Sequence, residues 1–256
     1  MMIVECLLIK DENQYLCEHI RNNMLAGVDF FFIYDNMSDV PVVDFLTSTD
    51  AALLNYCSIE RYNSCGRVLQ LDCYNDFISK HAASDDYVAF VDTDELFEGD
   101  LKAAISLYCN NKRSSIRFES VLHGCAGRVL DDGSNTLAAR FRNDILRMRD
   151  WTKTISRIST IKQIAVHNAY LKFPYTQITL NYTNCNIAHL HHYRFRSFEE
   201  YVKKILRGGC DSRTSLNIKS FFDYNTSIST TQEDVIKVMS RYNVDLLTTR
   251  RNGNDK

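Results

Sequence analysis

The sequence predicts an α/β protein with a mainly parallel sheet flanked by helices. In the first hundred residues, short apolar runs alternate with helical segments, and polar clusters follow three of these runs. Strand–helix alternation produces parallel strands joined by right-handed crossovers. Runs such as Phe30–Tyr34 are apolar without interruption, which indicates strands covered on both faces.

Four strands with helices between them are predicted in this first part. The strands cover residues 3–9, 30–34, 55–62 and 87–91, and two of the helices cover 42–48 and 69–82. Between the first two strands, Asp11 and Gln14 form a capping-box pattern that opens a helix. Gly27 stands where that helix is expected to end.

The second part continues with helices and strands in a less regular order. Asp100 is expected to cap a helix over 101–109. Strands are predicted over 114–124, 161–171 and 185–195, and turns with a hairpin over 128–143. Ser197 and Glu200 form a second capping box, opening a helix that ends at Gly208. One more helix is expected near 233–241. We therefore predict a main domain over 1–210 and a polar, helical C-terminal extension over 211–256.

Composition and charge narrow the function classes. The 256 residues are 45% hydrophobic, enough for one large core, and the formal net charge is -2. This charge argues against a general nucleic-acid binder. No run approaches the roughly 20 apolar residues of a membrane span, and no signal peptide is seen. We expect a cytoplasmic protein, or a soluble piece of a longer one. The nine cysteines include no CxxC pair, which argues against a disulfide framework.

The run "YVAFVDTDELFEGD" places Asp92 and Asp94 directly after an apolar strand. Ligands of open α/β sheets bind beyond the carboxyl ends of the strands. Two further polar clusters, at 10–12 and 35–39, follow other strands. Carboxylates at such positions suit Mg²⁺ or Mn²⁺, which prefer oxygen ligands and bridge to phosphate. The alternative for each cluster alone is a solvated cap.

Residues 151–198 contain no acid but many cations and histidines. This pattern is typical of a surface that binds anions, although chance explains it about equally well. The cluster "HLHHY" raises the possibility of a zinc site. On a strand, His189 and His191 share one face and His192 points to the other, so a site made of these histidines alone is unfavoured.

Several motifs together resemble the glycosyltransferases of family 92 (the DUF23 group), which have the GT-A fold. The matching pieces are "IKDENQYLCEHI", "AGVDFFFIYDNMSD", "LDCYND", "FVDTDELF", "KTISR" with His167, and "HHYRFRSFEEYVKKILRGG". They occur in the family's order over about residues 3–209. Two features depart from the family: "FESVLHGCAG" replaces a tryptophan-rich strand with its glycine-rich turn, and the membrane anchor of eukaryotic members is missing.

This resemblance implies a Rossmann-like GT-A sheet and a metal-dependent hexosyltransferase. The enzyme would move a sugar from a nucleotide-sugar, with UDP as the expected nucleotide, to a glycan or other hydroxyl acceptor, using Mn²⁺ or Mg²⁺. The expected metal ligands are Asp92, Asp94 and His192, and His167 is the alternative to His192. The two aspartates could bind the ribose of the nucleotide instead of the metal. The expected nucleotide-sugar contacts are Asp35 to the base, Lys10 and Glu12 along the same edge, and Lys153 or Arg157 to the diphosphate.

An inverting enzyme also needs a base that deprotonates the acceptor hydroxyl. In GT-A enzymes the base generally lies between the DxD motif, here Asp92-Thr93-Asp94, and a later metal ligand, here His192. Residues 151–198 offer no acid. The candidates left are Glu119, Asp131, Asp132, Asp144 and Asp150. Asp150 is the first choice and Glu119 the second, each with a plain surface acid as the alternative. Trp151, the only tryptophan, offers an apolar face for a sugar ring.

Two other classes stay open at this stage. A metal-dependent phosphohydrolase or nucleotidyltransferase would use the same acids and cations. A non-catalytic nucleotide- or glycan-binding module would bind ligand without turnover. The product formed from a UDP-sugar separates these possibilities.

Overall fold

The computed structural model describes residues 1–62, 69–133, 136–208 and 217–248. The chain divides into two compact units, each made of two segments. The first combines Met1–Val121 with Met148–His192, and the second combines Leu122–Arg147 with Tyr193–Lys256. The boundary predicted at residue 210 lies outside the described residues, so the division into 1–210 and 211–256 stays a prediction.

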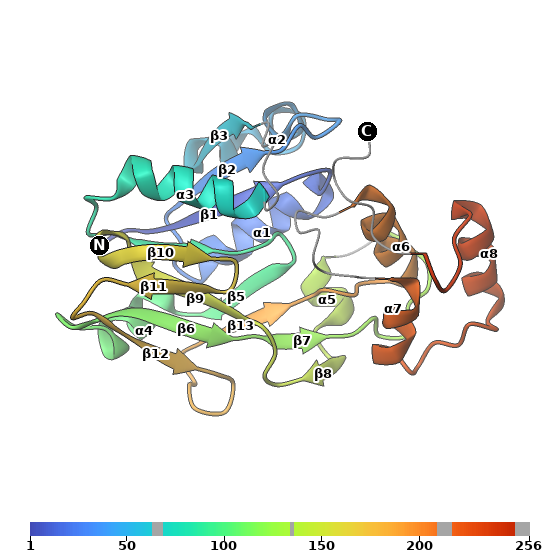
Figure 1. Ribbon diagram of the computed structural model, residues 1–256. Helices are drawn as coiled ribbons and strands as arrows, with labels where there is room; N and C mark the ends of the chain where they lie inside the picture. Colours follow the sequence, from blue (N-terminus) through green and yellow to red (C-terminus); the bar gives the residue numbers. More distant parts are fainter. Residues whose placement is uncertain (63–68, 134–135, 209–216, 249–256) are drawn as a thin grey trace. The chain divides into compact units, whose positions relative to one another are not determined.

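The first unit is built on a seven-stranded sheet with the order β12-β6-β9-β4-β1-β2-β3 (Figure 1). Four of these strands, β1 (Ile3–Ile9), β2 (Phe30–Asp35), β3 (Cys57–Arg61) and β4 (Tyr87–Phe90), run parallel to one another. They are the four strands predicted in the first part of the sequence. The predicted fold class, a mixed α/β protein with a mainly parallel sheet flanked by helices, is confirmed.

The other three strands of this sheet are β6 (Arg113–Glu119), β9 (Thr152–Arg157) and β12 (Thr176–Leu180). β9 runs antiparallel to both of its neighbours, β4 and β6, whereas β12 is parallel to β6. Because β9 is reversed, β4 and β6 point the same way. One edge of the sheet therefore contains the carboxyl ends of β1, β2, β4 and β6. The beginning of β9 lies at the same edge.

Helices cover both faces of the sheet because side chains alternate along each strand. Ile3 and Leu7 of β1 join one core cluster with apolar residues of α1, α2 and α4, whereas Val4 and Cys6 join another with α3. The helical elements of this unit are α1 (Asn13–Leu25), α2 (Val42–Thr49), η1 (Ala51–Tyr56), α3 (Leu69–His81), α4 (Leu101–Tyr108) and η2 (Ile158–Thr160). Asp100 caps α4 as predicted, its Oδ1 accepting the Ala103 N–H at 2.9 Å.

The predicted capping box of α1 is wrong. The N-cap residue is Glu12, and it makes no side-chain cap. Asp11 instead has a φ of 49° and joins the loop that follows β2. Its Oδ1 accepts the N–H of Asp39 at 2.8 Å, and its own N–H donates to Ser38 Oγ at 3.0 Å. The side chain is therefore used to hold two loops together rather than to cap a helix.

Two strand pairs differ from the prediction. The segment predicted as one strand over 161–171 is a hairpin of β10 (Ile161–Ala165) and β11 (Asn168–Leu171), because the chain turns at Val166 and His167. β5 (Glu95–Gly99), which was not predicted, pairs antiparallel with β13 (Ala188–His192). The strand predicted over 114–124 is interrupted at Ser120, which donates its N–H to Trp151 O at 3.1 Å.

The second unit contains α5 (Leu137–Phe141), α6 (Phe198–Arg207), α7 (Ile218–Tyr224), α8 (Glu233–Tyr242) and the antiparallel pair of β7 (Val121–His123) with β8 (Ile145–Arg147). The hairpin predicted over 128–143 is wrong, since Thr136 caps a short helix there. The capping box of Ser197 and Glu200 is confirmed, and Gly208 follows α6 with a φ of 90°. Across the described ranges, no helix has both the length and the apolar character needed to cross a membrane.

Candidate active site

Most of the predicted site residues gather at one edge of the sheet in the first unit. Lys10 follows β1 directly, Asp35 is the last residue of β2, and Asp92 lies just beyond β4. Glu119 ends β6, and Lys153 is near the beginning of β9. We call this side the carboxyl edge, and the topology places on it groups that are far apart in sequence.

Arg157 is not brought to the carboxyl edge. It ends β9, pairs with Tyr87 at the beginning of β4, and thus lies at the opposite end of that strand. Its guanidinium donates to the Tyr87 hydroxyl at 3.2 Å and lies 5.7 Å from the centre of the same ring. Of the two cations expected at the diphosphate, only Lys153 stands at the carboxyl edge.

Lys153 is buried between two acids. Its Nζ lies 3.1 Å from Asp92 Oδ2 and 3.2 Å from Glu95 Oε2, and its side chain is 1% exposed. Glu95 Oε2 also accepts the N–H of Asp92 at 2.9 Å, which closes the turn between β4 and β5. The lysine and Glu95 together hold the Asp92 carboxylate, which is partly exposed, at a defined position.

The burial of this cluster changes its titration. Burial raises the pKa of Glu95 to about 8, although the Lys153 ammonium opposes that shift. Burial also disfavours the charged form of Lys153, but the carboxylates of Asp92 and Glu95 outweigh it and raise the lysine pKa. Lys153 therefore keeps its positive charge at neutral pH.

Asp94, the second acid of the DxD motif, lies close to His192. In the antiparallel pair of β13 and β5, His192 stands opposite Glu95, the residue after Asp94. Its Nε2 lies 3.9 Å from Asp94 Oδ1, and both side chains are buried. His191, on the other face of β13, pairs with Glu98 at 2.7 Å. The pairing of the strands therefore brings His192, and not His191, close to Asp94.

The loops after β1 and β2 complete the edge. The Thr93 hydroxyl donates to Glu12, which links the first loop to the DxD turn. Asp11 and Met37, one in each loop, have φ values of 49° and 53°. Positive φ is uncommon outside glycine, and such backbone conformations cluster at functional sites. Because Lys10 follows β1 directly and Glu12 accepts the Thr93 hydroxyl, both residues lie at the same edge as the DxD motif.

Asp35 is engaged inside the protein. Its Oδ1 accepts the N–H of Ser38 at 2.9 Å, and its Oδ2 accepts the N–H of Val42 at 3.1 Å and Nη1 of Arg61 at 2.9 Å. The carboxylate is fully buried. It holds the beginning of α2, so its predicted contact with a nucleotide base would have to compete with these partners.

Both candidate bases lie near the beginning of β9. Glu119 pairs with Thr152 in the ladder of β6 and β9, and its Oε2 accepts Nδ2 of Asn181 at 3.1 Å. Asp150 donates its N–H to Ser120 O at 2.9 Å. Asp131, Asp132 and Asp144 belong to the second unit.

His167, the alternative to His192, lies in the turn of the β10–β11 hairpin. Its carbonyl accepts the Thr152 hydroxyl at 2.7 Å, and its ring stands edge to face with Trp151 at 4.6 Å between centroids. It is thus placed beside Trp151, whereas His192 is the histidine placed beside Asp94.

Two side chains that contact Asp92 or Lys153 are not among the site residues predicted from the sequence. Glu95 follows Asp94 directly, and its Oε2 lies 3.2 Å from Lys153 Nζ, but nothing in the sequence links the two residues. Gln70 of α3 donates through Nε2 to Asp92 Oδ1 at 2.5 Å. Gln70 directly precedes the motif "LDCYND", which is one of the pieces that resemble family 92, but it is not part of that motif.

The donor set can be compared with what a divalent ion requires. Among the residues that the structure describes, no three His, Cys, Asp or Glu side chains form a metal site by themselves. Asp94 and His192 lie close together. Asp92 is two residues from Asp94 in sequence, and its carboxylate is held in place by Lys153. Mg²⁺ is usually bound by one or two carboxylates plus substrate phosphates rather than by an all-protein cage. The residues present fit such a shared site.

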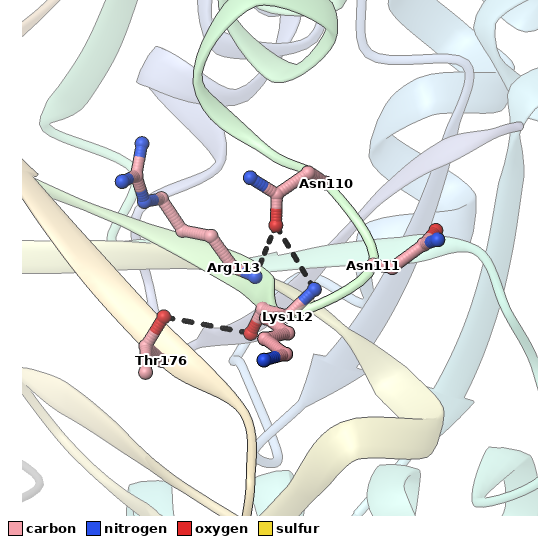
Figure 2. A pocket seen from close by; sticks show the side chains of 5 residues that line it. All are labelled: Asn110, Asn111, Lys112, Arg113 and Thr176. Atoms are coloured by element: carbon pink, nitrogen blue, oxygen red, sulfur yellow. Dashed lines mark hydrogen bonds between the residues drawn. The ribbon is translucent and has the colours of Figure 1, made fainter.

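A separate hollow of about 570 Å³ lies at the opposite end of the sheet, by the beginnings of β6 and β12 (Figure 2). Its lining consists of Asn110, Asn111, Lys112, Arg113 and Thr176. The Asn110 side chain accepts the N–H groups of Lys112 and Arg113, so these residues form an ordinary surface turn. None of the predicted site residues borders this hollow.

Comparison of the sequence with family models gives no match, and comparison with curated proteins gives none either. Among solved structures, TarS of S. aureus in complex with UDP is 14% identical, with a TM-score of 0.45 over 94% of this chain and 72% of that one. GalNAc-T7 with UDP, GalNAc and Mn²⁺ is 9% identical, with a TM-score of 0.44 over 96% of this chain and 55% of that one. A putative glucose-1-phosphate thymidylyltransferase from Bacillus anthracis has a TM-score of 0.39 at 7% identity, covering 62% and 72% of the two chains. Scores this low establish no activity for this chain.

Proposed function

We propose that this chain is a metal-dependent glycosyltransferase of the GT-A type, which transfers a sugar from a UDP-sugar to a hydroxyl acceptor. The observation that carries this proposal is the approach of His192 Nε2 to Asp94 Oδ1 at 3.9 Å, beside the Asp92–Lys153 pair. Carboxylates and one imidazole at the carboxyl edge of a mainly parallel sheet suit a diphosphate with its divalent cation.

Mn²⁺ or Mg²⁺ would be held by Asp94 and His192, with Asp92 as the further ligand, and would supply positive charge to the departing diphosphate. Electrostatic stabilisation of this kind is often the largest catalytic contribution. Lys153 adds a fixed positive charge behind the proposed metal ligand Asp92. Because its ammonium is buried against Asp92 and Glu95, it orients the Asp92 carboxylate rather than reaching out to the phosphates.

An inverting reaction needs a base on the acceptor side, for which Asp150 and Glu119 are proposed in that order. Both lie near the beginning of β9, close in sequence or strand pairing to Thr152 and Lys153. A retaining reaction would require no such base. The membership of family 92 is likewise part of this proposal, resting on the ordered motifs of the sequence.

The proposal is tested by incubating the protein with UDP-sugars and Mn²⁺ and identifying the nucleotide released. Glycosyl transfer, or slow transfer to water, releases UDP. Release of UMP would instead indicate a phosphohydrolase or nucleotidyltransferase, and binding without turnover would indicate a non-catalytic module. Asp94→Asn should abolish UDP release, whereas Asp86→Asn, at the other end of β4, should leave it unchanged.

A further inference from the structure

Two exposed aromatic rings flank the end of β6 at the carboxyl edge. Trp151, just before β9, is 40% exposed, and Tyr182, just after β12, is 42% exposed. β9 and β12 are the two neighbours of β6 in the sheet. Two strand spacings separate their backbones by about 10 Å. An exposed tryptophan and tyrosine at this spacing, both beside one strand end, call for a functional explanation.

The turn that carries Tyr182 is held rigidly. Asn181 Oδ1 accepts the N–H groups of Thr183 and Asn184 at 3.0 and 3.1 Å, and the Thr183 hydroxyl at 2.7 Å. Asn184 Oδ1 accepts the N–H of Asn181 at 2.7 Å. The ring of Tyr182 rests on His189 at 4.6 Å between centroids. A tyrosine presented in this way loses little freedom when it contacts a ligand.

Polar groups tie the two rings into one surface. Arg149 Nη2 donates to the Thr183 hydroxyl at 3.0 Å, so the segment before Trp151 is bonded to the turn of Tyr182. Its Nε lies 3.8 Å from Glu119 Oε2, the oxygen that also accepts Nδ2 of Asn181. The Glu119 carboxylate thus forms an ion pair with the Arg149 guanidinium and accepts a hydrogen bond from the Asn181 amide. These three groups lie between the segments that carry the two rings.

We propose that this surface is the acceptor subsite of the transferase and binds a neutral oligosaccharide of at least two sugar units. A sugar presents an apolar face of C–H groups and a rim of hydroxyls, which match aromatic rings and paired polar groups respectively. Because the backbones of β9 and β12 are about 10 Å apart, the surface is longer than one sugar ring, and the two aromatic rings would contact different sugars of one short chain. Arg149 and Glu119 compensate each other, so this pair adds no net charge that would favour an acidic or basic ligand.

The position of this subsite fits its role. Trp151 stands two residues before Lys153, which binds Asp92 of the DxD motif. Glu119, one of the two proposed bases, lies within the surface itself. A glycan on the two rings would therefore bring its hydroxyls to the carboxyl edge, where the nucleotide-sugar is expected. The role of this surface as an acceptor site rests on the proposed function. Its binding of an oligosaccharide does not, and that binding can be measured separately.

The test uses Trp151 as a probe, because it is the only tryptophan of the chain. The fluorescence of the whole protein is titrated with neutral di- and trisaccharides of the gluco, galacto and N-acetylglucosamine series. At least one should change the emission in a saturable manner. Tyr182→Ala should weaken that binding about tenfold, whereas Tyr182→Phe and Tyr56→Ala should change it by no more than about twofold. Tyr56 is a matched control, because it is also 42% exposed and lies by β3 at the far side of the sheet.

UDP binding in Mn²⁺, measured by calorimetry on the same variants, separates the two proposals. Normal UDP binding with no response to any oligosaccharide, or with equal affinity in Tyr182→Ala, would overturn the subsite and leave the transferase. Oligosaccharide binding that depends on Tyr182, without any UDP binding, would overturn the proposed transferase and support a carbohydrate site.

Discussion

His192 Nε2 lies 3.9 Å from Asp94 Oδ1, although the two residues belong to widely separated parts of the chain. The antiparallel pairing of β13 with β5 produces this contact, since it places His192 opposite Glu95 and turns His191 to the other face. A strand rather than a loop therefore brings this histidine to the DxD motif. A strand fixes the position of its side chains more tightly than a loop does, which would suit the cation site proposed here.

The Lys153 cluster should be a major source of stability. Lys153→Ala would leave the buried Glu95 carboxyl without its partner, and such a loss costs about 1–3 kcal/mol. Urea denaturation should show this loss in the free energy of unfolding. The matched control is Lys80→Ala, whose ion pairs with Asp76 and Glu60 are exposed and should contribute less than about 1 kcal/mol. Equal effects of the two substitutions would refute the structural role given to Lys153.

Asp35 should contribute to stability through its cap on α2. Asp35→Ala removes the acceptors of the Ser38 and Val42 N–H groups and the partner of Arg61. Unsatisfied buried groups cost about 1–3 kcal/mol, so the melting temperature should fall. Asp39→Ala, at an exposed position of the same loop, should have little effect. An unchanged melting temperature with weakened UDP affinity would instead support the nucleotide contact predicted from the sequence.

The base should act on kcat and not on donor affinity. Asp150→Asn and Glu119→Gln keep the shape of each side chain but remove its basicity. If the enzyme inverts, one of them should lower transfer to the acceptor by about a hundredfold or more while UDP affinity stays unchanged. Asp150 is expected to show the larger loss. Near-normal transfer in both variants would remove both residues from the role of base.

In the second unit, Glu200 should make stability depend on pH. Burial opposes its ionisation, but hydrogen bonds from Arg140 and Ser197 outweigh this and lower its pKa. A group with a lowered folded-state pKa stabilises the protein above its unfolded pKa, and that stability is lost as the pH falls through the folded value. The gap in unfolding free energy between the wild type and Glu200→Gln should therefore be constant above about pH 5 and shrink towards about pH 3. A gap independent of pH would contradict the lowered pKa.

The parallel half of the sheet was predictable because its strands are continuous apolar runs separated by helices. β5 was missed because Glu95–Gly99 carries acids among its apolar residues and its partner, β13, is distant in sequence. The capping box at Asp11 failed for a similar reason, since a loop from a different strand competes for the same side chain. Local patterns report local structure, and these contacts are long-range.

The same limit applies to the site. Sequence position was enough to expect Asp92 and Asp94 at a strand end, and the family resemblance pointed to His192. Neither revealed that Lys153 is enclosed by Asp92 and Glu95, because the burial of a charged residue depends on its partners in space. Arg157 illustrates the reverse case: it is four residues from Lys153, but that distance along β9 carries it to the other end of the strand.

The most direct test of the proposed cation site is the affinity for UDP, measured by calorimetry with Mn²⁺ and again with EDTA. We expect the wild type to bind in Mn²⁺ and to lose most of that affinity in EDTA. Asp94→Asn and His192→Phe should bind weakly in both buffers, whereas His191→Phe, one residue away on the other face of β13, should behave as the wild type. Equal UDP affinity with and without the metal, or an effect of His191→Phe as large as that of His192→Phe, would contradict a metal held by Asp94 and His192.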